Sequence, residues 1–134
     1  MSTPVSTSTV LIAAAKAIGL AVVINSILFF ALFTFKIIDP RFGTGPNHDQ
    51  TITILPVIFS TILPSVIGLV IFLLLLRYSS EPVKIFTWVV IAVFVITLGN
   101  PFFAGVPTVM ALGLDLLHIA PAYLLWSFLT QTIK

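Results

Sequence analysis

Residues 107–129, PTVMALGLDLLHIAPAYLLWSFL, form a stretch that is long and apolar enough to cross a lipid bilayer. The stretch also carries Asp115 and His118, whose spacing of three residues places both side chains on one face of an α-helix. No other carboxylate or imidazole in the sequence lies well inside an apolar segment. This segment therefore predicts a transmembrane helix that contains a polar site.

The composition of the whole chain is that of a membrane protein. Of its 134 residues, 59% are hydrophobic and 7% are charged, whereas about 25% are charged in ordinary soluble domains. The length suits a single domain over residues 1–134. The absence of cysteine excludes disulfides, thiol redox chemistry and cysteine-based metal sites. No Lys/Arg cluster indicates a nucleic-acid partner.

Three further apolar segments precede this stretch, and polar connections separate them. The segment 36–51 is rich in Pro and Gly and predicts the main loop, while the short charged turn 77–84 predicts a helical hairpin. We expect Gly99-Asn100-Pro101 to end the third helix. The predicted fold is an all-α membrane protein whose four transmembrane helices form an up-down-up-down antiparallel bundle. The predicted spans are about residues 10–35, 52–76, 82–98 and 107–129.

Basic residues predict the orientation of the chain in the membrane. Four spans place both termini and the turn 77–84 on the same side. Because basic residues are enriched on the cytoplasmic side, the larger basic count on that side predicts cytoplasmic termini. That side carries Lys16, Arg77, Lys84 and Lys134, and the other side carries Lys36 and Arg41.

The face of the fourth segment that carries the Asp–His pair is otherwise made of small residues. We expect this face to lie against the other helices, because small residues admit close helix approach. Larger side chains, Met110 and Leu117 among them, are expected to lie mostly elsewhere. Pro121 is expected to kink the helix and to free the carbonyl of Leu117. The face consists of Thr108, Ala111, Asp115, His118 and Ala122.

Polar residues of the other segments fall at a similar depth. At 1.5 Å per residue, Asp115 lies about 12 Å and His118 about 16 Å into a core about 30 Å thick. We therefore predict one buried polar cluster to which every span contributes a residue. Its expected members are His118, Asp115, Asn25, Ser60, Thr61, Ser65 and Thr97.

Three interpretations of this cluster stay open. In the structural one, Asp115, His118 and Asn25 hydrogen-bond one another and fix the helix register. In the second, Asp115 and His118 form a proton- or ion-linked transport site, because an ionised Asp in the middle of a membrane costs about 2.5–3.5 kcal/mol and marks a functional candidate. In the third, His118 is an axial ligand of haem or of a chlorophyll-type pigment.

Short motifs in all four segments resemble a known family. They are an Asn in VVINSILFF (residues 22–30), an R-x-x-x-x-P turn from Arg77 to Pro82, TLGNP (residues 97–101) and LDLLHIAPA (residues 114–122) with His118. Together they resemble the small bacterial four-helix membrane proteins of the domain of unknown function 6069. The resemblance implies the fold and a location in a bacterial plasma membrane, and it implies no activity. An apolar residue or Met is usual near Asp115 in that family, so the resemblance supports His118 more than Asp115.

Recognised catalytic patterns are missing from the sequence. It has no H-E-x-x-H, no G-x-S-x-G and no phosphate-cradling glycine loop, and the adjacent His48 and Asp49 alone do not make a metal site. We therefore expect a non-enzymatic protein that holds neither a metal nor a cofactor. The alternative is a haem or a pigment bound at His118. The expected role is that of a scaffold, an accessory subunit or a self-associating bundle. Its expected partners are the lipid bilayer and either further copies of the chain or a larger membrane complex.

Overall fold

Four long helices make up the protein in a computed structural model that describes residues 5–39, 53–103 and 105–133. Each helix is long and apolar enough to cross a membrane, and the described residues contain no strand. This confirms the predicted all-α fold with four membrane-spanning helices. The elements are α1 (Thr7–Thr34), α2 (Ile54–Tyr78), α3 (Pro82–Phe103), α4 (Thr108–Thr130) and a short 3-10 helix η1 (Gln131–Ile133).

The third helix differs most from its predicted bounds. Instead of ending near Leu98, α3 continues through Pro101 to Phe103. Proline costs a helix one backbone hydrogen bond but keeps a helical φ, and transmembrane helices tolerate such breaks. The Gly-Asn-Pro sequence is therefore part of α3 and does not end it.

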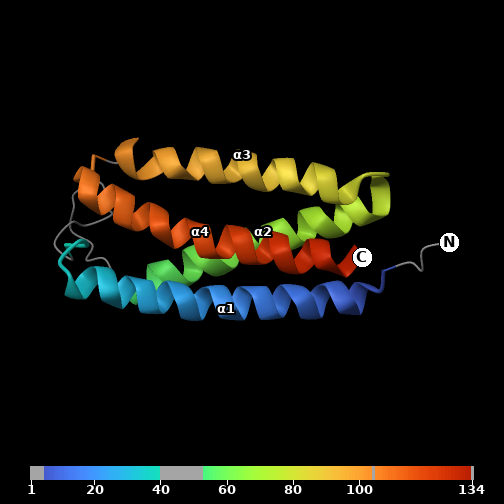
Figure 1. The fold of residues 1–134 in the computed structure, drawn as a ribbon, viewed down its shortest axis with the longest axis horizontal. Coiled ribbons are helices and arrows are strands. Elements are labelled where there is room, and N and C mark those ends of the chain that lie inside the picture. The colour runs from blue at the N-terminus through green and yellow to red at the C-terminus, as the bar shows by residue number, and fades with distance from the viewer. Residues whose placement is uncertain (1–4, 40–52, 104, 134) are drawn as a thin grey trace.

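The four helices alternate in direction along one long axis (Figure 1). The last of them, α4, packs against each of the other three, and α2 packs against both α1 and α3. Within the described residues α1 and α3 make no contact with each other. Both α2 and α4 therefore contact all three of the other helices and form the centre of the fold, with α1 and α3 on opposite sides of them (Figure 1).

The buried face of α1 shows how closely the helices approach. Ala14, Ala17 and Ala21 are each 1% exposed and lie three or four residues apart, so they form one stripe along α1. Asn25 continues this stripe and is 2% exposed. Small side chains let helix backbones approach closely, which brings the amide of Asn25 within reach of the neighbouring helices.

Two apolar clusters fill the interior, with a polar layer between them. The cluster near the chain termini contains a ring pair, Phe72 and Phe86, whose centroids are 4.8 Å apart. The cluster at the other end contains Phe29 and Met110. Asn25 lies between these clusters along α1, as does Thr61 along α2. The first cluster is Val10, Ala14, Ala17, Phe72, Phe86, Leu125 and Leu129, and the second is Phe29, Leu32, Ile38, Val57, Met110 and Leu117.

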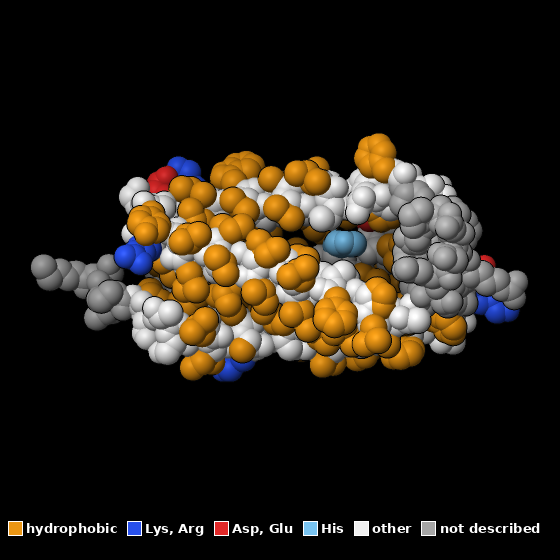
Figure 2. All heavy atoms as spheres, turned by 180° about the vertical axis from the view of Figure 1, so that it is seen from behind, with side chains coloured by type: hydrophobic (Ala, Val, Ile, Leu, Met, Phe, Trp, Pro, Cys, Tyr) orange, Lys and Arg blue, Asp and Glu red, His pale blue; other side chains and the backbone are white. Residues whose placement is uncertain are grey.

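Large hydrophobic side chains are exposed on all four helices. Hydrophobic side chains cover most of the face seen in Figure 2. Of the α3 side chains, only Phe86 and Pro101 are buried, while Trp88 is 65% exposed. An exposed surface of this kind suits acyl chains as its surroundings.

Candidate functional site

Asn25 joins three helices in the polar layer. Its side-chain nitrogen Nδ2 donates one hydrogen bond to Thr61 Oγ1 on α2, at 2.9 Å. The same nitrogen donates a second bond to the backbone carbonyl of Leu117 on α4, at 2.7 Å. Both bonds are buried. One side chain of α1 therefore fixes the positions of α2 and α4.

The sequence explains why both acceptors are free to accept these bonds. Pro121 has no backbone N–H, so the carbonyl of Leu117 has no helical donor four residues on. The hydroxyl of Thr61 donates to the carbonyl of Val57 at 2.8 Å, which leaves its oxygen to accept from Asn25. The carbonyl that the sequence predicts to be free is thus the one that Asn25 binds.

The other hydroxyls of the predicted cluster bond to their own helices. Ser65 is buried and donates to the carbonyl of Thr61 at 2.6 Å. Ser60 is exposed and bonds to the carbonyl of Val57 at 3.0 Å. Thr97 is half-buried and bonds to the carbonyl of Phe94 at 2.8 Å. No interhelical hydrogen bond joins Ser60, Ser65 or Thr97 to the other predicted members among the described residues.

Asp115 is buried, and its hydrogen bonding is incomplete. The residue is 9% exposed. Its carboxyl oxygen Oδ1 is enclosed and has no hydrogen-bond partner among the described residues. Asn25 has a similar oxygen, because its Oδ1 is also buried without a partner there. Both atoms are acceptors, so each can accept a hydrogen bond from a donor such as water, and the carboxyl oxygen can also bind a proton or a cation.

His118 is half-buried and bonds to its own helix. Its ring nitrogen Nδ1 lies 3.0 Å from the carbonyl of Leu114. A carbonyl can only accept a hydrogen bond, so Nδ1 is the donor nitrogen of this bond, and Nε2 takes no part in it. The ring nitrogen that can bind a proton or a metal is therefore Nε2.

Two expectations about α4 need correction. The mutual hydrogen bonding of Asp115, His118 and Asn25 is not formed, because Asn25 bonds to Thr61 and Leu117 while His118 bonds to Leu114. The buried face is also wider than predicted. Because α4 packs against three helices, its buried residues extend well beyond the small-residue face. They are Met110, Ala111, Gly113, Asp115, Leu117, Leu125 and Leu129, whereas Thr108 is exposed and His118 and Ala122 are half-buried.

Metal-binding groups of three or more His, Cys, Asp or Glu residues do not occur among the described residues. His48 and Asp49 lie outside the described part of the chain. Asp115 and His118 together offer a carboxylate and one imidazole nitrogen. This pair can bind and pass on a proton or contact a single cation.

The helices and the polar groups buried between them define an integral membrane protein with an ionisable site inside its fourth helix. The sequence matches the family of unknown function DUF6069 over residues 4–134. The chain therefore belongs to this family, as its motifs predict. Comparison with curated proteins found no match, and comparison with solved structures found none.

Proposed function

We propose that the protein is a small, non-enzymatic membrane carrier that moves a proton or a monovalent cation through Asp115 and His118. The observation that carries this proposal is the buried Oδ1 of Asp115, which has no partner among the described residues. A buried carboxylate without a partner is unfavourable in a membrane. A proton or a bound cation would supply the partner that Oδ1 of Asp115 does not find among the described residues.

Asn25 strengthens this interpretation because it already performs the structural role. Its two bonds connect α1, α2 and α4 without using either ionisable side chain. Asp115 and His118 are therefore not needed to fix the helix register. A role in binding and releasing an ion accounts for both residues.

The expected path begins at His118. In the proposed cycle, Asp115 releases its proton to water on one side of the membrane, Nε2 of His118 takes a proton from hydronium on the other side, and the imidazolium then passes a proton to the carboxylate of Asp115. The spacing of three residues places the two side chains within about 5–6 Å at their β-carbons, so a single water molecule can bridge them. The carboxyl group is neutral after this step, which lowers the cost of its burial. We propose further that the protein lies in the plasma membrane with cytoplasmic termini.

Ligation of haem or a pigment by His118 is the second candidate. The bond from Nδ1 to the carbonyl of Leu114 resembles the arrangement of metal-binding histidines, which donate their other ring N–H to a carbonyl or a carboxylate. The visible absorption spectrum of the purified protein, with and without added haem, tests this directly. A spectrum without a haem band under both conditions excludes haem.

The carrier proposal can be tested in vesicles that contain a pH-sensitive dye. A potassium gradient with valinomycin imposes a membrane potential, and the rate of internal acidification reports proton flux. We expect Asp115→Asn to reduce the flux of the wild-type protein at least tenfold, and His118→Gln to reduce it strongly. Ser60→Ala changes an exposed hydroxyl that bonds to its own helix, so its flux should equal that of the wild type.

Sodium and potassium are tested with the same vesicles and ion-selective dyes. Equal rates of ion flux for the wild type and Asp115→Asn contradict the proposal. Wild-type flux no higher than that of protein-free vesicles for protons, sodium and potassium contradicts it as well. Circular dichroism checks that each variant is helical. The mass of the protein in mild detergent reports on a scaffold or self-associating role, which predicts an oligomer or a co-purifying partner.

A further inference from the structure

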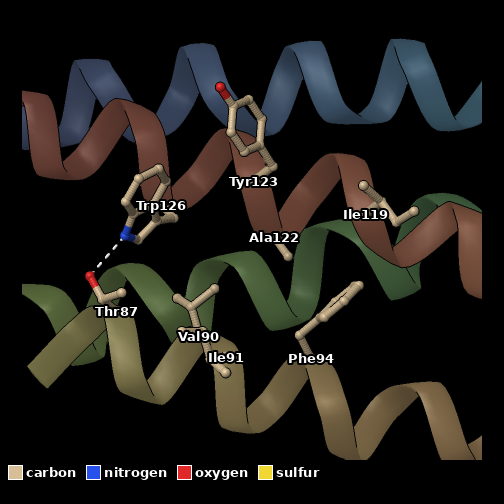
Figure 3. A pocket seen from close by; sticks show the side chains of 8 residues that line it. All are labelled: Thr87, Val90, Ile91, Phe94, Ile119, Ala122, Tyr123 and Trp126. Carbon is tan, nitrogen blue, oxygen red and sulfur yellow. Dashed lines mark hydrogen bonds between the residues drawn. The ribbon is translucent and has the colours of Figure 1, made fainter.

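A groove of about 320 Å³ lies between α3 and α4, and neither Asp115 nor His118 lines it. Thr87, Ile91 and Phe94 line it from α3, and Ala122 and Trp126 line it from α4 (Figure 3). Across one end, the indole Nε1 of Trp126 donates a hydrogen bond to Thr87 Oγ1 at 2.9 Å. The groove is thus an apolar channel along the outside of the helices, with one polar bridge.

The polar bridge lies near the charged end of α3. Lys84 precedes Thr87 by three residues, so it lies on the same helix face about 4.5 Å further along the axis. Ile91 and Phe94 continue that face at the i+7 and i+10 positions. The ammonium group of Lys84 forms an exposed ion pair with Glu81 at 3.0 Å. Exposed pairs of this kind contribute little, so Lys84 can exchange Glu81 for another anion.

The length and lining of the groove suit an acyl chain. From Thr87 to Phe94 it extends about 10 Å along α3. Apart from Thr87 its lining is made of apolar and aromatic side chains, and such a surface in a membrane-spanning helix favours contact with hydrocarbon. An extended hydrocarbon chain matches both the length and the lining.

We propose that this groove is a binding site for an anionic phospholipid. One acyl chain lies along Phe94, Ile91 and Ala122, and the phosphate of the headgroup binds Lys84. Charge complementarity favours an anionic headgroup over a zwitterionic one, because the basic side chain stands at the end of an apolar channel. Arg77, which lies 5.4 Å above the ring of Tyr78 at the end of α2, adds positive charge at the same end of the molecule (Figure 1).

Tryptophan fluorescence can test this site, because Trp126 lines the groove. Trp88→Phe removes the other tryptophan of the chain and serves as the background. The protein is reconstituted with phosphatidylcholine that contains 10% phosphatidylglycerol, with brominated acyl chains on one lipid or the other. We expect brominated phosphatidylglycerol to quench Trp126 at least threefold more, per mole, than brominated phosphatidylcholine.

Three variants separate the parts of the proposal. Ala122→Phe fills the groove and should remove the preference, while Leu116→Phe adds the same ring on an exposed face of α4 and should preserve it. Lys84→Gln should reduce the preference to about one without preventing quenching. Equal quenching per mole by both lipids in the background protein overturns the proposal, as does an unchanged preference in Ala122→Phe. Quenching that falls as the protein-to-lipid ratio rises assigns the groove to a second copy and likewise overturns it.

Discussion

Replacement of Asn25 by leucine should destabilise the protein because it removes both interhelical bonds of the polar layer. Leucine has the same branching and the same number of side-chain heavy atoms, so the change leaves no cavity. Thr61 keeps its own bond to the carbonyl of Val57. The carbonyl of Leu117, however, loses its donor, since Pro121 cannot replace the missing N–H.

The expected magnitude follows from opposing contributions. Hydrogen bonds between membrane helices contribute about 0.6 kcal/mol each on average, and about 1.7 kcal/mol at most. Leaving the Leu117 carbonyl without a partner adds to the loss, within the range of about 1–3 kcal/mol for a buried polar group. Removal of Oδ1 of Asn25, which is buried and has no hydrogen-bond partner in the part of the chain that the structure describes, offsets part of it. The net loss of unfolding free energy should be about 1–2 kcal/mol.

Pro121→Ala provides the internal test of this reasoning. Alanine restores an N–H that can bond to the carbonyl of Leu117, so this carbonyl no longer needs Asn25. In a double-mutant cycle, Asn25→Leu should therefore cost about 1 kcal/mol less in the Pro121→Ala background than in the wild type. Reversible unfolding in detergent micelles, followed by circular dichroism, measures the four free energies.

Ser26→Ala is the matched control for this cycle. Ser26 is the neighbour of Asn25, and its hydroxyl donates only to the carbonyl of Val22, on its own helix, at 2.7 Å. The change should alter the unfolding free energy by less than about 0.5 kcal/mol. A cycle with no coupling between Asn25 and Pro121 would refute the idea that the amide replaces the missing backbone donor.

Three further changes test other contacts by the same unfolding assay. Gly113→Ala should destabilise the protein by about 1–3 kcal/mol, because the added Cβ would lie 2.8 Å from a methyl group of Ile37. Gly19→Ala is the control: its Cβ would meet nothing within 4 Å, so this change should be neutral or stabilising. Similar results for the two variants would contradict this packing. Asp115→Asn should stabilise the protein by about 1 kcal/mol, because a neutral amide costs less to bury than a carboxylate, and a loss of stability would show that the carboxyl group supports the fold. Phe86→Ala removes a fully buried ring and should cost about 3 kcal/mol; a cost below about 1 kcal/mol would place that ring outside the core.

The sequence predicted the helices better than it predicted their rotation. Long apolar segments identify membrane spans, because the thickness of the bilayer fixes the length that is needed. In a soluble protein the polar side of each helix also shows which face is exposed. Here the lipid-facing and buried faces are both apolar, so the sequence did not reveal that Met110 and Leu117 are buried.

The candidate site was predicted only in part, because the sequence did not reveal how each helix is rotated about its axis. Pro121 correctly indicated a free carbonyl at Leu117, since that effect is local to one helix. Ser60 and Thr97 were grouped with Asn25 because they lie at a similar depth in the membrane. Which side chains contact each other also depends on the rotation of each helix about its axis, and depth does not give that rotation. The hydrogen bond between Thr87 and Trp126 was missed, because neither residue is distinctive in an apolar sequence.

The position of α4 has a consequence for the order of assembly during synthesis. This helix packs against all three others and is made after them. Before α4 is made, α1 and α3 have α2 alone as a partner, and the carbonyl that Asn25 binds does not yet exist. We therefore expect the contacts of α1 and α3 with α4, and the second hydrogen bond of Asn25, to form only when the last helix inserts.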